Sequence, residues 1–127
     1  MENKIHALDV SVKSNYLREE SMPGHAQFVF SYTVTIKNTG GIAAQLLRRH
    51  WVITDANGIK IEVVGEGVVG EQPYLRPGEQ YEYTSMTSIG TPVGVMHGSY
   101  QMVGDDGVTF VAPIPAFRLA MLRQVFH

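Results

Sequence analysis

The residues with the clearest chemical potential lie between positions 48 and 70. Three glycines there spell G-x-G-x-x-G, and a basic Arg-Arg-His run occupies positions 48–50. Consecutive backbone N–H groups in a glycine loop can cradle an anion, and a neighbouring arginine can supply balancing charge. The candidate anion-binding or partner-binding residues are Gly65, Gly67, Gly70, Arg48, Arg49 and His50.

The glycine motif does not fit a dinucleotide-binding fingerprint. That fingerprint places the pyrophosphate on the N-terminus of a helix within a βαβ unit. Here Pro73 and Pro77 follow the motif and forbid an ordinary helix interior. Glu66 and Glu71 would also repel a phosphate. Two interpretations stay open: a weaker anion-binding nest, or glycines that only let the chain adopt positive φ.

The histidines are scattered and give no metal-ligand spacing. They lie at positions 6, 25, 50, 97 and 127, and the chain has no cysteine. A tight site needs three or four converging ligands, so we expect no resident metal or cofactor. His50 and His97 could meet across two sheets, although no feature of the sequence requires it. The acidic pair Asp105-Asp106 is flanked by glycines and is typical of a hairpin turn.

Catalytic residues are not identifiable. No serine or threonine has a recognisable base beside it in the sequence, and no nucleophile elbow is present. We therefore expect a non-enzymatic role, although chemistry carried by loops stays open, with a hydrolase of phosphorylated compounds as the least supported possibility.

The elements that must position these residues are strands. From Gln27 to Lys37, apolar and polar residues alternate with period two, as in a half-buried strand. Further strand-like runs cover residues 8–13, 44–54, 59–64, 81–87, 96–102, 108–112 and 117–119, and residues 65–78 form a long loop. No segment has a helical period. The pattern predicts an all-β fold, an antiparallel β-sandwich of seven to eight strands of the fibronectin type III or immunoglobulin-like kind.

Alternation places Leu47, Arg49, Trp51 and Ile53 on one face of the run at 44–54. We expect Trp51 in the core, and Arg49 should then point the same way unless a bulge shifts the register. A buried arginine needs a carboxylate, for which Glu66 and Glu79 are the candidates, or several carbonyl groups. Alternatively its head reaches water near the end of the strand.

Length and composition indicate the number of domains, the cellular location and the classes of partner. The chain has 127 residues, 44% of them hydrophobic, and a net charge of −2. We expect a single domain over residues 1–127, with a core at about 5–119 and a tail at 120–127 of uncertain structure. Without a basic excess, a transmembrane run or a secretory signal, we expect a cytoplasmic protein that binds neither nucleic acid nor membrane. Between residues 65 and 113, Arg76 is the one Lys or Arg among six acidic residues.

Five segments together carry a more specific signal: Arg49–Asp55, Val63–Pro73, Leu75–Glu79, Pro92–Tyr100 and Ile114–Leu119. Taken together, they resemble the ApaG family. The resemblance runs from about Val10 to Leu119 and implies a fibronectin type III-like domain. It also implies a link to cobalt and magnesium tolerance, a gene near a dinucleoside-polyphosphate hydrolase, and a protein-binding role like that expected in some eukaryotic F-box proteins. No catalytic residues are carried over.

These observations favour a small, soluble binding module that presents loops and a sheet edge to an unknown protein partner. The edge near Pro113–Leu119 and the glycine loop are the surfaces we expect to matter. The alternative is a weak phosphate, pyrophosphate or dinucleoside-polyphosphate binder, with or without Mg²⁺, that uses Gly65–Gly70 with Arg48 or Arg49. We expect a monomer or a weak dimer.

Overall fold

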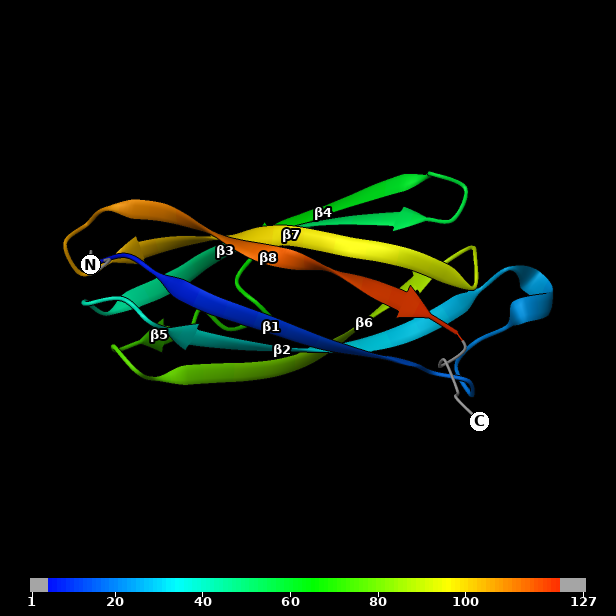
Figure 1. The fold of residues 1–127 in the computed structure, drawn as a ribbon, viewed down its shortest axis with the longest axis horizontal. Helices are drawn as coiled ribbons and strands as arrows, with labels where there is room; N and C mark the ends of the chain where they lie inside the picture. The colour runs from blue at the N-terminus through cyan, green and yellow to red at the C-terminus, as the bar shows by residue number, and fades with distance from the viewer. Residues whose placement is uncertain (1–4, 122–127) are drawn as a thin grey trace, which may run out of the picture.

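The computed structural model describes residues 5–121, which form two antiparallel sheets packed face to face (Figure 1). The three-stranded sheet has the order β1 (Leu8–Tyr16), β2 (Phe28–Asn38), β6 (Gln80–Ile89). The five-stranded sheet has the order β4 (Lys60–Glu66), β3 (Ala44–Asp55), β7 (Val93–Gly104), β8 (Thr109–Ala120), and β5 (Tyr74–Leu75) pairs with β3. One short 3-10 turn, η1 (Pro23–His25), precedes β2.

The predicted β-sandwich is confirmed, and its strand order is that of a fibronectin type III-like domain. The strand β5 was not predicted, because two residues that pair with Ala44 and Gln45 leave no periodic signal. Pro113 and Pro115 predicted an edge, and β8 is indeed an edge strand of its sheet. The strand nevertheless continues through both prolines, with a register shift opposite Met96 to Gly98 that accommodates Pro115.

The core lies between the sheets and is built by alternating residues of β2, β3, β7 and β8. Trp51 is 2% exposed, which confirms its prediction as a core residue. Its ring centroid lies 5.3 Å from that of Tyr32 and 5.9 Å from that of Phe117, in edge-to-face contacts. Trp51 thus joins the two sheets.

A bulge in β3 changes the predicted register near the start of that strand. Its pairing with β7 shifts between Leu46 and Arg48, so Leu46 is buried and Leu47 is only half-buried. The expectation that Leu47 shares the inner face with Trp51 is therefore wrong. Arg49 and Ile53 do share it, because alternation is regular beyond the bulge.

The sandwich is closed on one side and open on the other. On the closed side, β1 lies against β8, and the Ser14 hydroxyl donates to the Arg118 carbonyl at 2.7 Å. On the open side, a cavity of about 220 Å³ lies between β3, β4 and β6. β4, at the top of Figure 1, therefore forms the uncovered margin of the five-stranded sheet.

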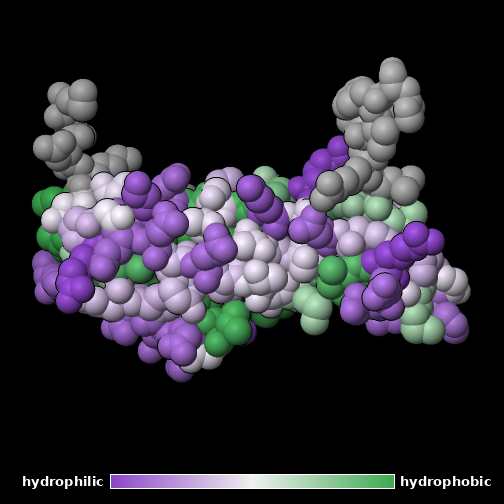
Figure 2. Space-filling model, turned by 90° about the horizontal axis from the view of Figure 1, so that it is seen from below, coloured by the Kyte–Doolittle hydropathy of each residue, from purple (hydrophilic) through white to green (hydrophobic). Residues whose placement is uncertain are grey.

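The outer face of the three-stranded sheet is largely polar. Figure 2 shows the molecule from below the view of Figure 1, with hydrophilic and neutral residues interrupted by small apolar patches. Threonines 33 and 84 are joined there by a hydroxyl hydrogen bond of 2.8 Å across β2 and β6. Within residues 5–121, no helix has the length and apolar character needed to cross a membrane.

Candidate functional site

The six candidate residues divide between two faces of the five-stranded sheet. Opposite residues of paired strands share a face. Arg48 lies opposite Glu66 and Gln101, and His50 lies opposite Val64 and Ser99, so both side chains belong to the outer face. Arg49 lies opposite Gly65 and Tyr100 and belongs to the inner face. Gly67 and Gly70 continue the chain beyond β4.

A hollow of about 350 Å³ lies on the outer face. Its lining residues come from β3, β4, β7 and β8: Arg48, Arg49, His50, Val64, Ser99, Gln101 and Val111. Among residues 5–121, the Arg48 side chain makes no hydrogen bond or ion pair. His50 Nε2 lies 3.2 Å from a carboxylate oxygen of Glu62. The hollow thus places a cation with free hydrogen-bonding capacity beside the apolar side chains of Val64 and Val111.

Arg49 is held by backbone carbonyl groups. Its Nη1 donates to the carbonyl oxygens of Glu66 at 2.9 Å and Gly67 at 3.0 Å. The guanidinium lies directly over Gly65, where a Cβ would come within 2.7 Å of Nη1 and 2.8 Å of Cζ. The expected carboxylate partners, Glu66 and Glu79, are therefore not used, and the carbonyl alternative is the one observed. Any side chain at position 65 would therefore displace the Arg49 guanidinium from these carbonyl groups.

The glycine loop is a tight hairpin. Val68 and Glu71 exchange reciprocal backbone hydrogen bonds of 2.8 and 2.9 Å around Val69 and Gly70, which both have positive φ, at 49° and 79°. Positive φ at both central positions is the pattern of a type I′ turn. The Gly67 N–H donates to Leu47 O at 2.9 Å. The N–H groups of residues 67, 68 and 71 are thus used within the protein and do not point at a ligand.

Val68 anchors this hairpin. Its side chain is 0% exposed and belongs to the core cluster. The Gln72 side chain adds a hydrogen bond of 3.0 Å to Leu47 O, at the bulge of β3. The loop is therefore fastened to β3 at both ends. This geometry agrees with the interpretation in which the glycines let the chain adopt positive φ, as Gly67 and Gly70 do.

The cavity on the open side is lined by Trp51, whose indole N–H is a buried hydrogen-bond donor. Trp51 lines it together with Arg49, and within the described chain Trp51 Nε1 is a buried nitrogen without a hydrogen-bond partner. Nearby, the hydroxyl groups of Tyr83 and Tyr100 form a short hydrogen bond between the two sheets. Burial raises the pKa of both phenols well above the ordinary value, although the Arg49 charge acts in the opposite direction. The sequence carries no signal for this contact, because the two tyrosines belong to different sheets.

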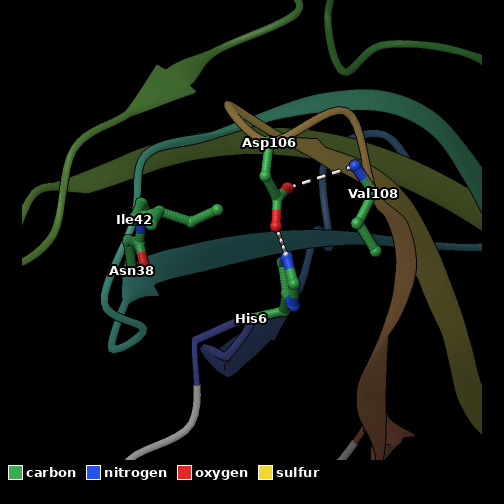
Figure 3. Close-up of polar contacts among 5 residues, drawn as sticks. All are labelled: His6, Asn38, Ile42, Asp106 and Val108. Atoms are coloured by element: carbon green, nitrogen blue, oxygen red, sulfur yellow. Dashed lines mark hydrogen bonds and ion pairs between the residues drawn. The ribbon is translucent and has the colours of Figure 1, made fainter.

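A second polar contact ties the N-terminal segment to the β7–β8 turn (Figure 3). His6 Nε2 lies 2.8 Å from Asp106 Oδ2, and Asp106 Oδ1 accepts from the Val108 N–H at 3.1 Å. The Val108 N–H and then His6 lower the pKa of the Asp106 carboxyl. Asp106 therefore lies in a hairpin turn, as expected, but its pairing with His6 had no signal in the sequence because 100 positions separate them.

The histidines do not converge. His50 and His97 lie on the same sheet rather than across two sheets, since His97 pairs with Val52 and His50 pairs with Ser99. In the part of the chain that the structure describes, no group of three or more His, Asp or Glu side chains could hold a metal ion. His127 and most of the predicted tail lie outside the described residues.

Comparisons with known proteins agree with this architecture. The sequence profile of the ApaG domain matches residues 18–104. Protein ApaG of Methylococcus capsulatus is 61% identical over 125 residues, which cover 98% of this chain and 99% of the relative. Protein ApaG of Thiobacillus denitrificans is 57% identical over 126 residues, with 99% and 98% coverage. A crystal structure from Bordetella pertussis matches with a TM-score of 0.93 and 50% identity, covering 97% of this chain and 100% of that one.

The fold and the surface features thus define a fibronectin type III-like domain with an outer-face hollow. The chain belongs to the ApaG family.

Proposed function

We propose that this chain is a cytoplasmic protein-binding module without catalytic activity, and that its partner docks on the outer face of the five-stranded sheet. The observation that carries the proposal is the hollow around Arg48. Its guanidinium has no partner among residues 5–121 and lies beside the side chains of Val64 and Val111, which are 57% and 66% exposed. Interfaces commonly gain most of their affinity from an arginine or aromatic anchor beside apolar contacts.

The chemistry of the hollow specifies the kind of partner segment. A guanidinium presents a planar fork of donors that matches a carboxylate. The apolar walls match an aliphatic or aromatic side chain, and the Gln101 side chain, opposite Arg48 in the register, adds polar capacity. A segment with an acidic residue next to an apolar one satisfies all three. The cobalt and magnesium tolerance linked to the family then follows from the partner, with no metal held by this chain.

The anion-binding alternative has less support from the geometry. The N–H groups of residues 67, 68 and 71 already donate to backbone carbonyls. Arg49 is engaged by the Glu66 and Gly67 carbonyls and lies on the inner face, opposite to Arg48. A phosphate bound by these N–H groups and Arg49 would therefore have to displace bonds that hold the hairpin together.

Variants that alter the charge of the hollow test the proposal. Arg48→Glu reverses a charge there and Val111→Asp adds one, whereas Lys13→Glu and Met86→Asp make the corresponding changes at exposed positions of the three-stranded sheet. We expect affinity capture with the wild-type protein to retain a partner that both hollow variants lose and both control variants keep. Equal capture by all five proteins would contradict the proposal.

A titration with pyrophosphate, with and without Mg²⁺, tests the alternative. Amide shifts confined to residues 65–72 would favour a ligand at the loop, and we expect no such shifts at micromolar ligand.

A further inference from the structure

The edge strand β4 lacks the prolines and the neighbouring strand that protect the opposite edge of the same sheet. β8 carries Pro113 and Pro115 and lies against β1, as described above. β4 has no proline and exposes Ile61 at 48%, Val63 at 37% and Val64 at 57%. An exposed apolar edge without proline or a bulge is a surface to which another strand can add.

The phase of the ladder shows which backbone groups of β4 are available. Asp55 N–H donates to Ile59 O at one end of the β3–β4 pair, and Gly67 N–H donates to Leu47 O at the other. Hydrogen-bonded pairs alternate in an antiparallel ladder. Ile61, Val63 and Gly65 therefore direct their backbone groups at β3, whereas residues 60, 62, 64 and 66 direct theirs away from the sheet.

We propose that β4 pairs antiparallel with β4 of a second copy of this chain, on a two-fold axis at Val63. This register places Lys60 opposite Glu66 of the second copy, twice across the axis, and Glu62 opposite Val64. All four are residues whose backbone groups face outward, so the ladder can form. Opposite charges across a strand pair are favourable, and the interface is self-complementary as a two-fold contact requires.

Other registers fit the charges or the strand length less well. A two-fold axis at Glu62 would place the two copies of Glu62 opposite each other, and an axis at Val64 would place Glu62 opposite Glu66. Both registers oppose like charges, which is unfavourable. A centre at Ile61 joins Lys60 with Glu62 but extends into the turn at Gly58, whose φ is 81°. The register centred on Val63 pairs all seven residues of β4.

Pairing in this register also covers apolar surface. In a two-fold antiparallel pair, the inner faces of both sheets lie on the same side. Ile61 and Val63 share the inner face with Ile53 and Trp51, to which they are paired. The four side chains of two copies would therefore form one apolar strip beside the open-side cavities. This edge contact leaves the Arg48 side chain on the outer face, so it goes beyond the proposed function and does not depend on it.

Cysteine cross-linking tests the register directly, because the chain has no native cysteine. At a non-hydrogen-bonded antiparallel pair the Cα atoms lie about 4.5 Å apart, within the range of a disulfide. We expect Val63→Cys to form a disulfide-linked dimer under mild oxidation. The matched control Ile61→Cys lies on the same face but about 13 Å from its copy, four residues along the strand, and should remain monomeric.

Charge exchange tests the same register without a covalent bond. Lys60→Glu and Glu66→Lys should each weaken self-association in sedimentation about tenfold, and the double variant should restore it, with melting temperatures recorded to verify folding. Cross-linking of Ile61→Cys in place of Val63→Cys would overturn the register. A purified wild-type chain that stays monomeric at millimolar concentration, as it would if β4 served an unlike protein, would overturn the proposal, whereas the capture experiment on Arg48 would be unaffected.

Discussion

Replacing Gly65 with alanine tests how Arg49 fastens β4 to the glycine loop. The new Cβ would lie within 2.7 Å of Nη1 and 2.8 Å of Cζ and Nη2. The guanidinium is the far end of a flexible side chain, so it can move away, but it then loses its bonds to the carbonyls of Glu66 and Gly67. A hydrogen bond to a charged group contributes about 1.5–3 kcal/mol, and partial exposure reduces this. We expect a total loss of about 2 kcal/mol in the free energy of unfolding.

A double-mutant cycle measured by urea denaturation is the decisive assay. Arg49→Ala should cost about the same, and Gly65→Ala should cost almost nothing once Arg49 is already alanine, because no guanidinium remains to be displaced. Gly67→Ala serves as the comparison: its φ is +62° and its Cβ would collide with the Glu71 carbonyl, so its cost should not depend on Arg49. Equal costs of Gly65→Ala in both backgrounds would show that Arg49 does not set the cost of a side chain at position 65.

Three further predictions concern buried and titrating groups. Trp51 should emit at short wavelength in the native state, and Trp51→Ala should cost ~3–5 kcal/mol in chemical denaturation; red-shifted native emission would contradict its burial. The raised pKa of Tyr83 and Tyr100 means that their contribution to stability is complete below pH ~10 and is lost as the pH rises further, because the unfolded phenols ionise first. The melting temperature should therefore fall above pH ~10, less steeply in Tyr100→Phe, and an unchanged slope would argue against the pair. The lowered pKa of Asp106 gives stability that is present above the ordinary carboxyl pKa and lost as the pH falls through the lowered value. Asp106→Asn should reduce the melting temperature at neutral pH and weaken the acid dependence, and identical acid profiles for the two proteins would disprove this.

The fold was accessible from the sequence because period-two alternation is a local signal. Residues 27–37 predicted the central strand of the three-stranded sheet, and β2 covers Phe28–Asn38. The turn chemistry around Asp105-Asp106 marked its hairpin correctly, since Gly107 has positive φ.

The details of the site were less accessible because they depend on contacts between distant segments. The bulge at Leu47 leaves no pattern, because two adjacent leucines fit either register, yet it decides which leucine is buried. Arg49 was recognised as an unusual residue, but its carbonyl partners follow from the path of the loop after β4. The contacts Tyr83–Tyr100 and His6–Asp106 join elements that only the topology brings together.

The assignment of the outer face as the partner surface is tested most directly by site-specific photo-cross-linking in cells. A photoreactive residue at position 111 lies in the hollow beside Arg48, and one at position 84 lies on the outer face of the three-stranded sheet. We expect a discrete cross-linked complex with another protein from position 111, lost when Arg48→Glu is added, and none from position 84. Absence of a complex from position 111, or the same complexes from both positions, would contradict it.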